Sequence, residues 1–386
     1  MTTTESDMRI EIGADAYTDI CDTVEKICRE FPAEYWRELE DRPLGDRYPA
    51  SFVAALGGAG IMAALVPEAY DGAGLPLEAA AAIIETIHAT GCNAALPIQQ
   101  FRLTALLAGA DNEPLKRAIL PRLADGSLTL QAFAHDEADD AGCVAVPSGD
   151  AVALSGTKTR VLAPVESGAM IVSARENDTD EKPTALYLVE AGSDSAGLVP
   201  TPYGEMTNTC VADVRFDKVA ILASNRIAPA DTGGALIVAA DVVLRILEAA
   251  AAIGDGRFFS RRGAAYAKER VVFGNPIGKY QGIQFPLAKA HIEVEAAFIG
   301  LRRAMALYDA GLDAGVAASV AHYLAMEAAW NMADAAFTTH GGFAFAREYD
   351  IERKWRDVRA MKLAAVPYKG DLTEIGESAL GLPRSY

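Results

Sequence analysis

The chain has 386 residues, 51% of them hydrophobic and 23% charged, and a formal net charge of −18. This composition is typical of a soluble enzyme with one large core or two to three domains, and the acidic balance argues against a nucleic-acid-binding surface. The longest apolar runs, at 79–84 and 235–247, are short or interrupted by charge, whereas a membrane-spanning helix needs roughly 18 apolar residues. The N-terminus has no basic region followed by an apolar core, so we expect no secretion signal and no membrane partner.

The five cysteines are scattered and show neither disulfide-framework nor metal-ligand spacing. We therefore expect a reducing, cytoplasmic setting and no metal site.

Three regions of different periodicity follow one another along the chain. Helical spacing of apolar residues dominates the first region, in segments 51–64, 77–89 and 103–123. The second region holds short apolar or alternating runs bounded by Gly, Pro, Asp and Asn, which predict strands beginning at Ala151, Ala169, Ala185 and Val211. The third region is helical again, with long Ala-rich segments at 235–269, 281–310, 314–340 and 349–364. The sequence thus predicts an α+β protein with three domains, at 1–127, 128–228 and 229–386.

The stretch from Arg270 to Gln284 has the composition of a cofactor-binding loop. It follows the helical run that ends at Glu269, contains Gly and Pro, and leads into a new helical run near Gln281. Arg270 offers a bidentate fork for phosphate oxygens, Phe273 a packing face, and Gln281 a neutral amide. An ordinary turn between helices with an Arg cap remains the alternative.

Four further motifs give the chain a family resemblance. They are PEAYDGAG at 67–74, HGGFAF at 340–345, EYDIERKWRD at 348–357 and LPRSY at 382–386. With these residues the chain resembles the acyl-CoA dehydrogenases nearly from end to end. The resemblance implies an N-terminal helical domain, a middle β-barrel-like domain, a C-terminal four-helix bundle, and FAD as the cofactor.

The positions that bind the ADP part of FAD are largely retained. Arg270, Phe273, Gln281 and the pair Gly341 and Gly342 match the family pattern. Part of this site comes from the neighbouring subunit in the family, which implies a homodimer or homotetramer. The glutamine that the family has shortly before the glycine pair is Thr338 here, so one amide is lost.

The positions around the isoalloxazine ring depart further from the family. The segment that runs from Phe133 through His135 and Asp136 to Cys143 lacks the flavin-contacting hydroxyls and carries several acidic groups. Acidic groups that face a reduced, anionic flavin would disfavour it; a solvated acidic loop is the alternative. The tryptophan that usually covers the flavin is replaced by Arg160, which either offsets the acidic segment or points to water.

The catalytic base is the most consequential departure. The family reaction needs a carboxylate that removes the α-proton of the thioester. One family position for it holds Lys369 and the other Leu244. Asp241 and Glu248 lie three residues before and four after Leu244, so they can share one helix face with it and supply a relocated base; alternatively, Glu248 pairs with Arg245 or with a neighbouring helix.

Arg102 begins a helix that borders the acyl pocket in the family, where its cation can bind a polar or anionic substituent or form a salt bridge.

Three hypotheses about the function follow from these observations. In the first, the protein acts on an acyl thioester, carried by CoA or an acyl carrier protein, with chemistry altered by the missing base. In the second, it is an ordinary dehydrogenase with Glu248 or Asp241 as the base. In the third, it is a non-catalytic subunit of a hetero-oligomer.

Overall fold

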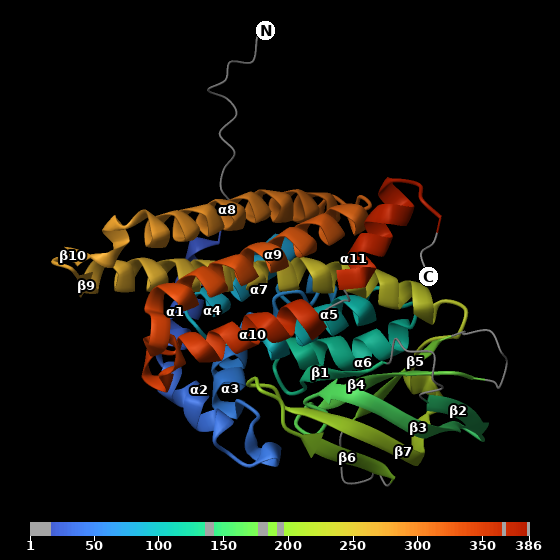
Figure 1. Ribbon diagram of the computed structural model, residues 1–386. Coiled ribbons are helices and arrows are strands. Elements are labelled where there is room, and N and C mark those ends of the chain that lie inside the picture. The colour runs from blue at the N-terminus through green and yellow to red at the C-terminus, as the bar shows by residue number, and fades with distance from the viewer. Residues whose placement is uncertain (1–16, 136–142, 177–183, 191–196, 365–367, 384–386) are drawn as a thin grey trace.

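The computed structural model describes residues 17–135, 143–176, 184–190, 197–364 and 368–383. It places them in N-terminal helices, a β region and a C-terminal helical bundle (Figure 1). The predicted α+β architecture is therefore confirmed. The domain limits at 127/128 and 228/229 remain a prediction.

The N-terminal region is helical, as its periodicity predicts. Its helices are α1 (Thr18–Arg29), α2 (Ala33–Glu40), α3 (Ala50–Gly58), α4 (Leu77–Ala89), α5 (Ala95–Ala108) and α6 (Glu113–Ala124). The predicted single run at 103–123 is wrong, because the chain leaves the helix at Gly109. It re-enters a helix after Asn112, whose side chain accepts a hydrogen bond from the backbone N–H of Leu115 at 3.1 Å and so caps α6.

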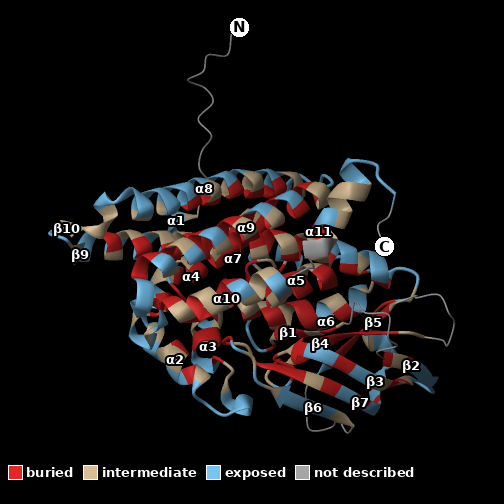
Figure 2. Ribbon diagram, in the orientation of Figure 1, coloured by how far each residue is buried: buried red, intermediate tan, exposed pale blue. Residues whose placement is uncertain are grey.

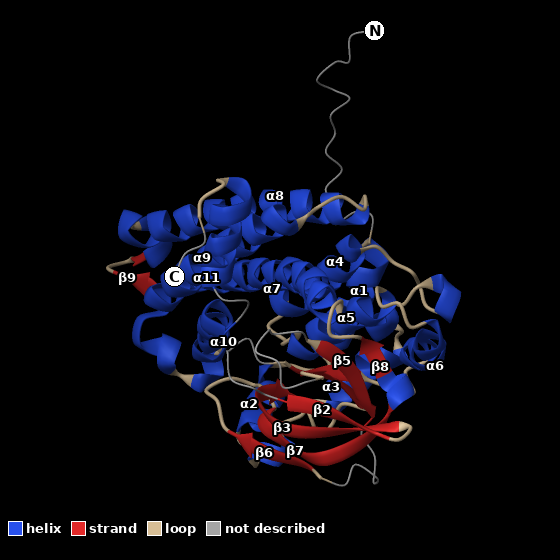
Figure 3. Cartoon of the chain, turned by 90° about the vertical axis from the view of Figure 1, so that its right-hand side faces the viewer, coloured by secondary structure: helices blue, strands red, loops and turns tan. Residues whose placement is uncertain are grey.

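Two four-stranded sheets form the middle region, with strand orders β1-β4-β5-β8 and β2-β3-β7-β6 (Figure 3). The strands are β1 (Leu130–Ala134), β2 (Cys143–Ser148), β3 (Ala151–Leu162), β4 (Ala169–Ala174), β5 (Ala185–Glu190), β6 (Leu198–Tyr203), β7 (Val211–Leu222) and β8 (Arg226–Ala228). The four predicted strands are among them.

The first sheet lies between the second sheet and the helices. On one face Val172 and Tyr187 share a core with Leu154 and Phe216 of the second sheet. On the other face leucines and isoleucines of β1, β4 and β5 pack against α5, α6 and the first part of α7. All six residues of β4 are consequently buried, as expected for a strand that is apolar except at Ser173 (Figure 2).

The C-terminal bundle is built around one long helix. Its helices are α7 (Gly233–Glu269), α8 (Gln281–Asp309), α9 (Gly315–His340), α10 (Ile351–Ala364) and α11 (Tyr368–Glu374), and a small hairpin of β9 (Val271–Val272) and β10 (Asn275–Pro276) joins α7 to α8. A Cβ atom on Gly254 would lie 2.4 Å from the carbonyl oxygen of Glu85, so glycine permits the close approach of α7 and α4. Within the described residues, no helix combines the length and the apolar run that crossing a lipid bilayer requires.

A buried ionic cluster connects α7 to α10 and α4. Lys354 and Asp255 are both 0% exposed, and Lys354 Nζ lies 2.6 Å from Asp255 Oδ1. His88 Nδ1 lies 3.0 Å from Asp255 Oδ2, and its Nε2 accepts a hydrogen bond from the N–H of Ala94. The carboxylate of Asp255 is therefore approached from two helices at once.

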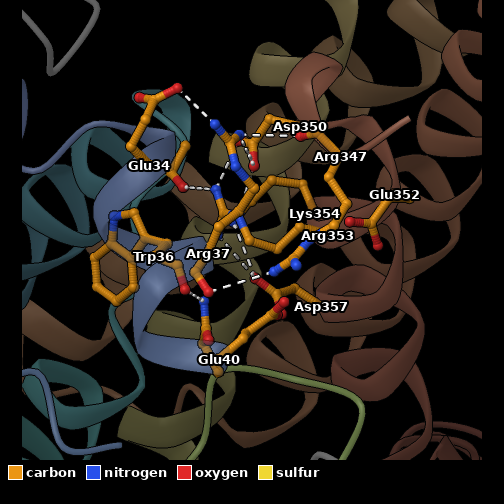
Figure 4. A network of polar contacts seen from close by, with 12 residues as sticks. Glu34, Trp36, Arg37, Glu40, Arg347, Asp350, Glu352, Arg353, Lys354 and Asp357 are labelled. Atoms are coloured by element: carbon orange, nitrogen blue, oxygen red, sulfur yellow. Dashed lines mark hydrogen bonds and ion pairs between the residues drawn. The ribbon is translucent and has the colours of Figure 1, made fainter. Parts of the chain in front are cut away.

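The neighbouring residue on α10 anchors the same region of the fold. Arg353 is fully buried, donates to both carboxylate oxygens of Asp350 at 2.7 Å, and donates to the carbonyl of Gly91 (Figure 4). Arg356 extends the network outward to Glu40 on α2. Positive groups on α10 thus fix this helix against the N-terminal region.

Replacing Lys354 by Met should cost about 3 to 5 kcal/mol of stability, because Asp255 would keep a buried charge without its cation. Adding Asp255→Asn should restore most of the loss, since the amide oxygen still accepts from His88. Urea unfolding midpoints of both variants and the wild type test this, and a double variant no more stable than Lys354→Met would contradict it.

Candidate active site

A cavity of about 210 Å³ opens between the β region and the helices. Its wall comes from the start of α5, from β3, from segment 205–211 and from α7 and α10, and its polar side chains include Gln99, Arg160, Thr209, Glu248 and Asp357. Gln99 Oε1 is buried and accepts no hydrogen bond from a described residue, so it can accept one from a ligand. In the described parts of the chain, no group of His, Cys, Asp and Glu is arranged to hold a metal ion.

Glu248 is the cavity-facing end of a chain of charged groups. Its Oε2 lies 3.3 Å from Nε2 of His322 on α9. The other ring nitrogen of His322, Nδ1, is hydrogen-bonded to Asp371 Oδ2 on α11 at 2.5 Å. Asp371 Oδ1 in turn lies 3.2 Å from Nε of Arg245, one turn before Glu248 on α7. Arg245 therefore pairs with Asp371, and Glu248 pairs with a residue of the neighbouring helix α9. Of the two pairings expected as the alternative to a base, the one with Arg245 is wrong and the one with a neighbouring helix is confirmed.

The two carboxylates decide the charge of His322. Burial alone would lower its pKa, but the hydrogen bond to Asp371 and the proximity of Glu248 outweigh this and raise the pKa to about 9. At neutral pH the ring is therefore an imidazolium. The four groups then alternate in sign from Arg245 to Glu248, and their formal charges cancel.

Asp241, the other candidate base, is committed elsewhere. Its carboxylate forms a salt bridge with Arg102 on α5, and both side chains are largely buried. The guanidinium carbon of Arg102 lies 4.7 Å from the centre of the Phe133 ring. Arg102 is thus held between a carboxylate and an aromatic face, which is the salt-bridge alternative of the sequence analysis.

Comparison with known proteins identifies the family of this chain. Residues 15–127 match the model of the acyl-CoA dehydrogenase N-terminal domain, and residues 233–365 match that of the C-terminal domain. The acyl-CoA dehydrogenase FadE12 of Mycobacterium tuberculosis is 30% identical over 374 residues, which cover 94% of this chain and 96% of that protein. The chain belongs to the acyl-CoA dehydrogenase family. Members of this family are flavoprotein oxidoreductases.

Solved structures of this family share the fold. A glutaryl-coenzyme A dehydrogenase in complex with glutaryl-CoA superposes with a TM-score of 0.87 at 21% identity, covering 99% of this chain and 97% of that one. The ChsE4-ChsE5 complex from Mycobacterium tuberculosis gives a TM-score of 0.83 at 23% identity, covering 99% of each chain.

At the acyl-CoA dehydrogenase positions for the base, the structure offers one answer. Leu244 is buried on α7 and cannot carry a proton. The side chain of Lys369 lies outside the described part of the structure. Of the two relocated candidates, Glu248 lines the cavity and Asp241 does not.

Of the described residues predicted for the isoalloxazine end, Arg160 lines the cavity, whereas Phe133 lies against Arg102. His135 stacks on Phe133 and is hydrogen-bonded to Ser173 at 2.9 Å. Burial, followed by the positive charges of Lys158 and Arg102, lowers the pKa of His135 to about 4, so the ring is neutral. Asp136 lies outside the described residues, and its predicted effect on the flavin remains a prediction.

Arg160 occupies the position where the family has a tryptophan, and its side chain forms an ion pair within the protein. Its Nε lies 2.7 Å from Glu205 Oε1, and its backbone N–H donates to Asp213 Oδ1. The side chain is half exposed and lines the cavity. Neither predicted alternative describes it fully, because its charge is paired with a carboxylate of the cavity wall.

The residues predicted for the ADP end lie at the far end of the bundle. Arg270 ends α7, Gln281 begins α8, and Phe273 at the hairpin tip is 93% exposed (Figure 1). Arg270 is 22 residues beyond Glu248, hence roughly 33 Å along the same helix. One chain does not bring the two ends of the predicted flavin site together, which fits a site shared between subunits.

The glycine pair and Thr338 lie close to that end. Gly341 ends α9 at a φ of 57°, a region that favours glycine, and no atom lies within 4 Å of a Cβ built on Gly341 or Gly342. Thr338 lines a second cavity of about 300 Å³ between α8 and α9. Open glycine backbone beside exposed Arg and Gln donors is a set of groups that fits a diphosphate and its nucleoside.

His322, Asp371 and Asp357 were missed by the sequence analysis. His322 lies in an Ala-rich helix with no partner at a recognisable spacing. Asp371 is three residues after Tyr368, within the segment already identified, and Asp357 belongs to the quoted EYDIERKWRD motif. Only the meeting of α7, α9 and α11 identifies the first two as neighbours of Glu248.

The raised pKa of His322 has a consequence for stability. Since the folded-state pKa of about 9 lies above the ordinary 6.5, the protonated ring contributes stability below pH 6.5, and this is lost as pH rises through 9. The contribution is about 3 kcal/mol. The thermal midpoint of wild type should exceed that of His322→Gln clearly at pH 6 and much less at pH 10. An equal gap at both pH values would contradict it.

Proposed function

We propose that this protein is an FAD-dependent enzyme that acts at the α and β carbons of an acyl thioester, with Glu248 as the base. The observation that carries the proposal is the position of Glu248, whose carboxylate lines the cavity while its partners lie behind it in the core. The thioester is carried by CoA or by an acyl carrier protein.

The role of Glu248 follows from its surroundings. An α-proton of a thioester is acidic enough to be removed by a carboxylate that is held ionised within reach. Glu248 takes this proton, and Gln99, which also lines the cavity, offers its Oε1 as an acceptor for a donor group of the ligand. When bound, FAD supplies the acceptor for the hydride that leaves the β carbon.

Several residues would hold the cofactor. Phe133, His135 and Arg160 lie at the isoalloxazine end, whereas Arg270, Phe273, Gln281, Thr338, Gly341 and Gly342 lie at the ADP end of the same chain. Because these ends are far apart, the ADP end of one chain serves the cavity of a second copy. An exposed apolar stripe on α8, formed by Phe285, Ile292 and Ile299 at steps of seven residues, supports a homodimer or homotetramer.

This proposal favours one of the three hypotheses from the sequence. The altered-chemistry hypothesis rested on a missing base, and a carboxylate at the cavity wall supplies one. A non-catalytic subunit has no need for a cavity-facing carboxylate with a charge-matched support in the core. Both remain outcomes that the following experiment separates.

Glu248→Gln should reduce turnover by at least about a hundredfold, because the amide cannot accept the α-proton, while flavin content stays unchanged. The measurement is anaerobic bleaching of the bound flavin by a panel of acyl-CoA thioesters. Asp241→Asn is the comparison: its carboxylate is held by Arg102, so turnover should stay within about tenfold.

Inactive Asp241→Asn with active Glu248→Gln would assign the base to Asp241. Bound flavin that no thioester bleaches in the wild type would favour altered chemistry, and purified protein without flavin would favour the non-catalytic subunit.

A further inference from the structure

His322 lies at a point where three helices meet. It belongs to α9, faces Glu248 of α7 and Asp371 of α11, and is 2% exposed. Arg245 is the other charged group of α7 at this point, and it reaches His322 only through Asp371. These are the charged groups that approach the ring within the described structure.

The cluster becomes steadily less buried toward the cavity. The side chain of Asp371 is 1% exposed, that of His322 is 3%, and that of Glu248 is 14%. Only the last residue in this series lines the cavity. The series therefore runs from Asp371 in the core to Glu248 at the cavity, where we propose that the substrate binds.

Charge balance requires a protonated ring. With a neutral imidazole, Arg245 would be the one cation among the described side chains that opposes the two carboxylates of Glu248 and Asp371. With an imidazolium, each carboxylate has a cation beside it, and water is largely excluded, so the attraction is strong. The raised pKa of His322, about 9, agrees with this state.

A protonated His322 cannot relay the substrate proton. Both ring nitrogens already carry hydrogen, so the ring has no site to accept a proton from Glu248. The contact between Nε2 and Oε2 is an ion pair at 3.3 Å, and Oε2 is buried beside the ring. His322 thus acts on Glu248 through its charge, while the carboxylate remains able to accept a proton.

We propose that His322 is a positioning residue for the reaction: anchored by Asp371, its imidazolium holds the Glu248 carboxylate ionised and directed into the cavity. The inference rests on the proposed function, because it assigns a role to a neighbour of the base. Asp371 and Arg245 then serve to keep the imidazolium in place.

The first test is the pH dependence of kcat/KM for His322→Gln and His322→Lys. The Gln variant removes the cation, so the acid limb should move to higher pH by at least about one unit. The Lys variant keeps a cation and should leave the limb near its wild-type position. A merely structural role would lower activity without moving this limb, and an unmoved limb in His322→Gln overturns the proposal.

The second test requires no turnover. The ring signals of the five histidines are followed by NMR against pH, and the signal absent from His322→Gln is assigned to His322. It should titrate near pH 9 in the wild type and lower by at least about one unit in Asp371→Asn, which removes a neighbouring negative charge. Titration near the ordinary value of 6.5 in the wild type overturns the proposal.

The two proposals fail in different ways. Retained turnover in Glu248→Gln overturns the function of Glu248 as base, and this inference with it. An inactive Glu248→Gln combined with an unmoved acid limb in His322→Gln overturns the positioning role alone. If His322→Gln does not fold, Asp371→Asn gives the same comparison, since it weakens the hold on the imidazolium, and an unmoved limb there also overturns the role.

Discussion

The ion pair between Lys354 and Asp255 is the contact on which the rest of this structure depends. Both side chains are fully buried, so each charge is tolerable only because the other is present. The pair joins α10 to α7, and the approach of His88 adds α4. These three helices carry part of the cavity wall. The contact that stabilises the bundle therefore also holds Glu248 of α7 and Asp357 of α10 at the same cavity.

Helix α7 organises the centre of the molecule through three carboxylates. Asp241, Glu248 and Asp255 follow one another at steps of seven residues and therefore lie along one side of the helix. Each meets a cationic group from a different element: Arg102 on α5, His322 on α9 and Lys354 on α10. Of the three, the middle one lines the cavity, which is why we propose it as the base, while its neighbours hold the fold.

Much of the fold could be predicted because each helix and strand shows its own apolar periodicity within a short stretch of sequence. The long Ala-rich segments became α7, α8, α9 and α10, and the alternating runs became strands, since apolar spacing directly reflects which side is buried. The break before α6 was missed although Asn112 and Pro114 signal it, because apolar periodicity continues across the turn. Of the site, the sequence identified Glu248, Arg102 and Asp241 as candidates but could not choose among them.

The sequence alone determined the family and the order of helical and β regions, and it predicts residues for the two ends of a flavin site, because these inferences depend on motifs and spacing within short stretches. Tertiary structure decided which carboxylate lines the cavity. Asp241 and Glu248 are equivalent along the sequence, yet Arg102 comes from 139 residues away to neutralise one, and His322 and Asp371 arrive from two other helices behind the other. Such pairings connect residues that are far apart in the chain, so no local sequence pattern predicts them.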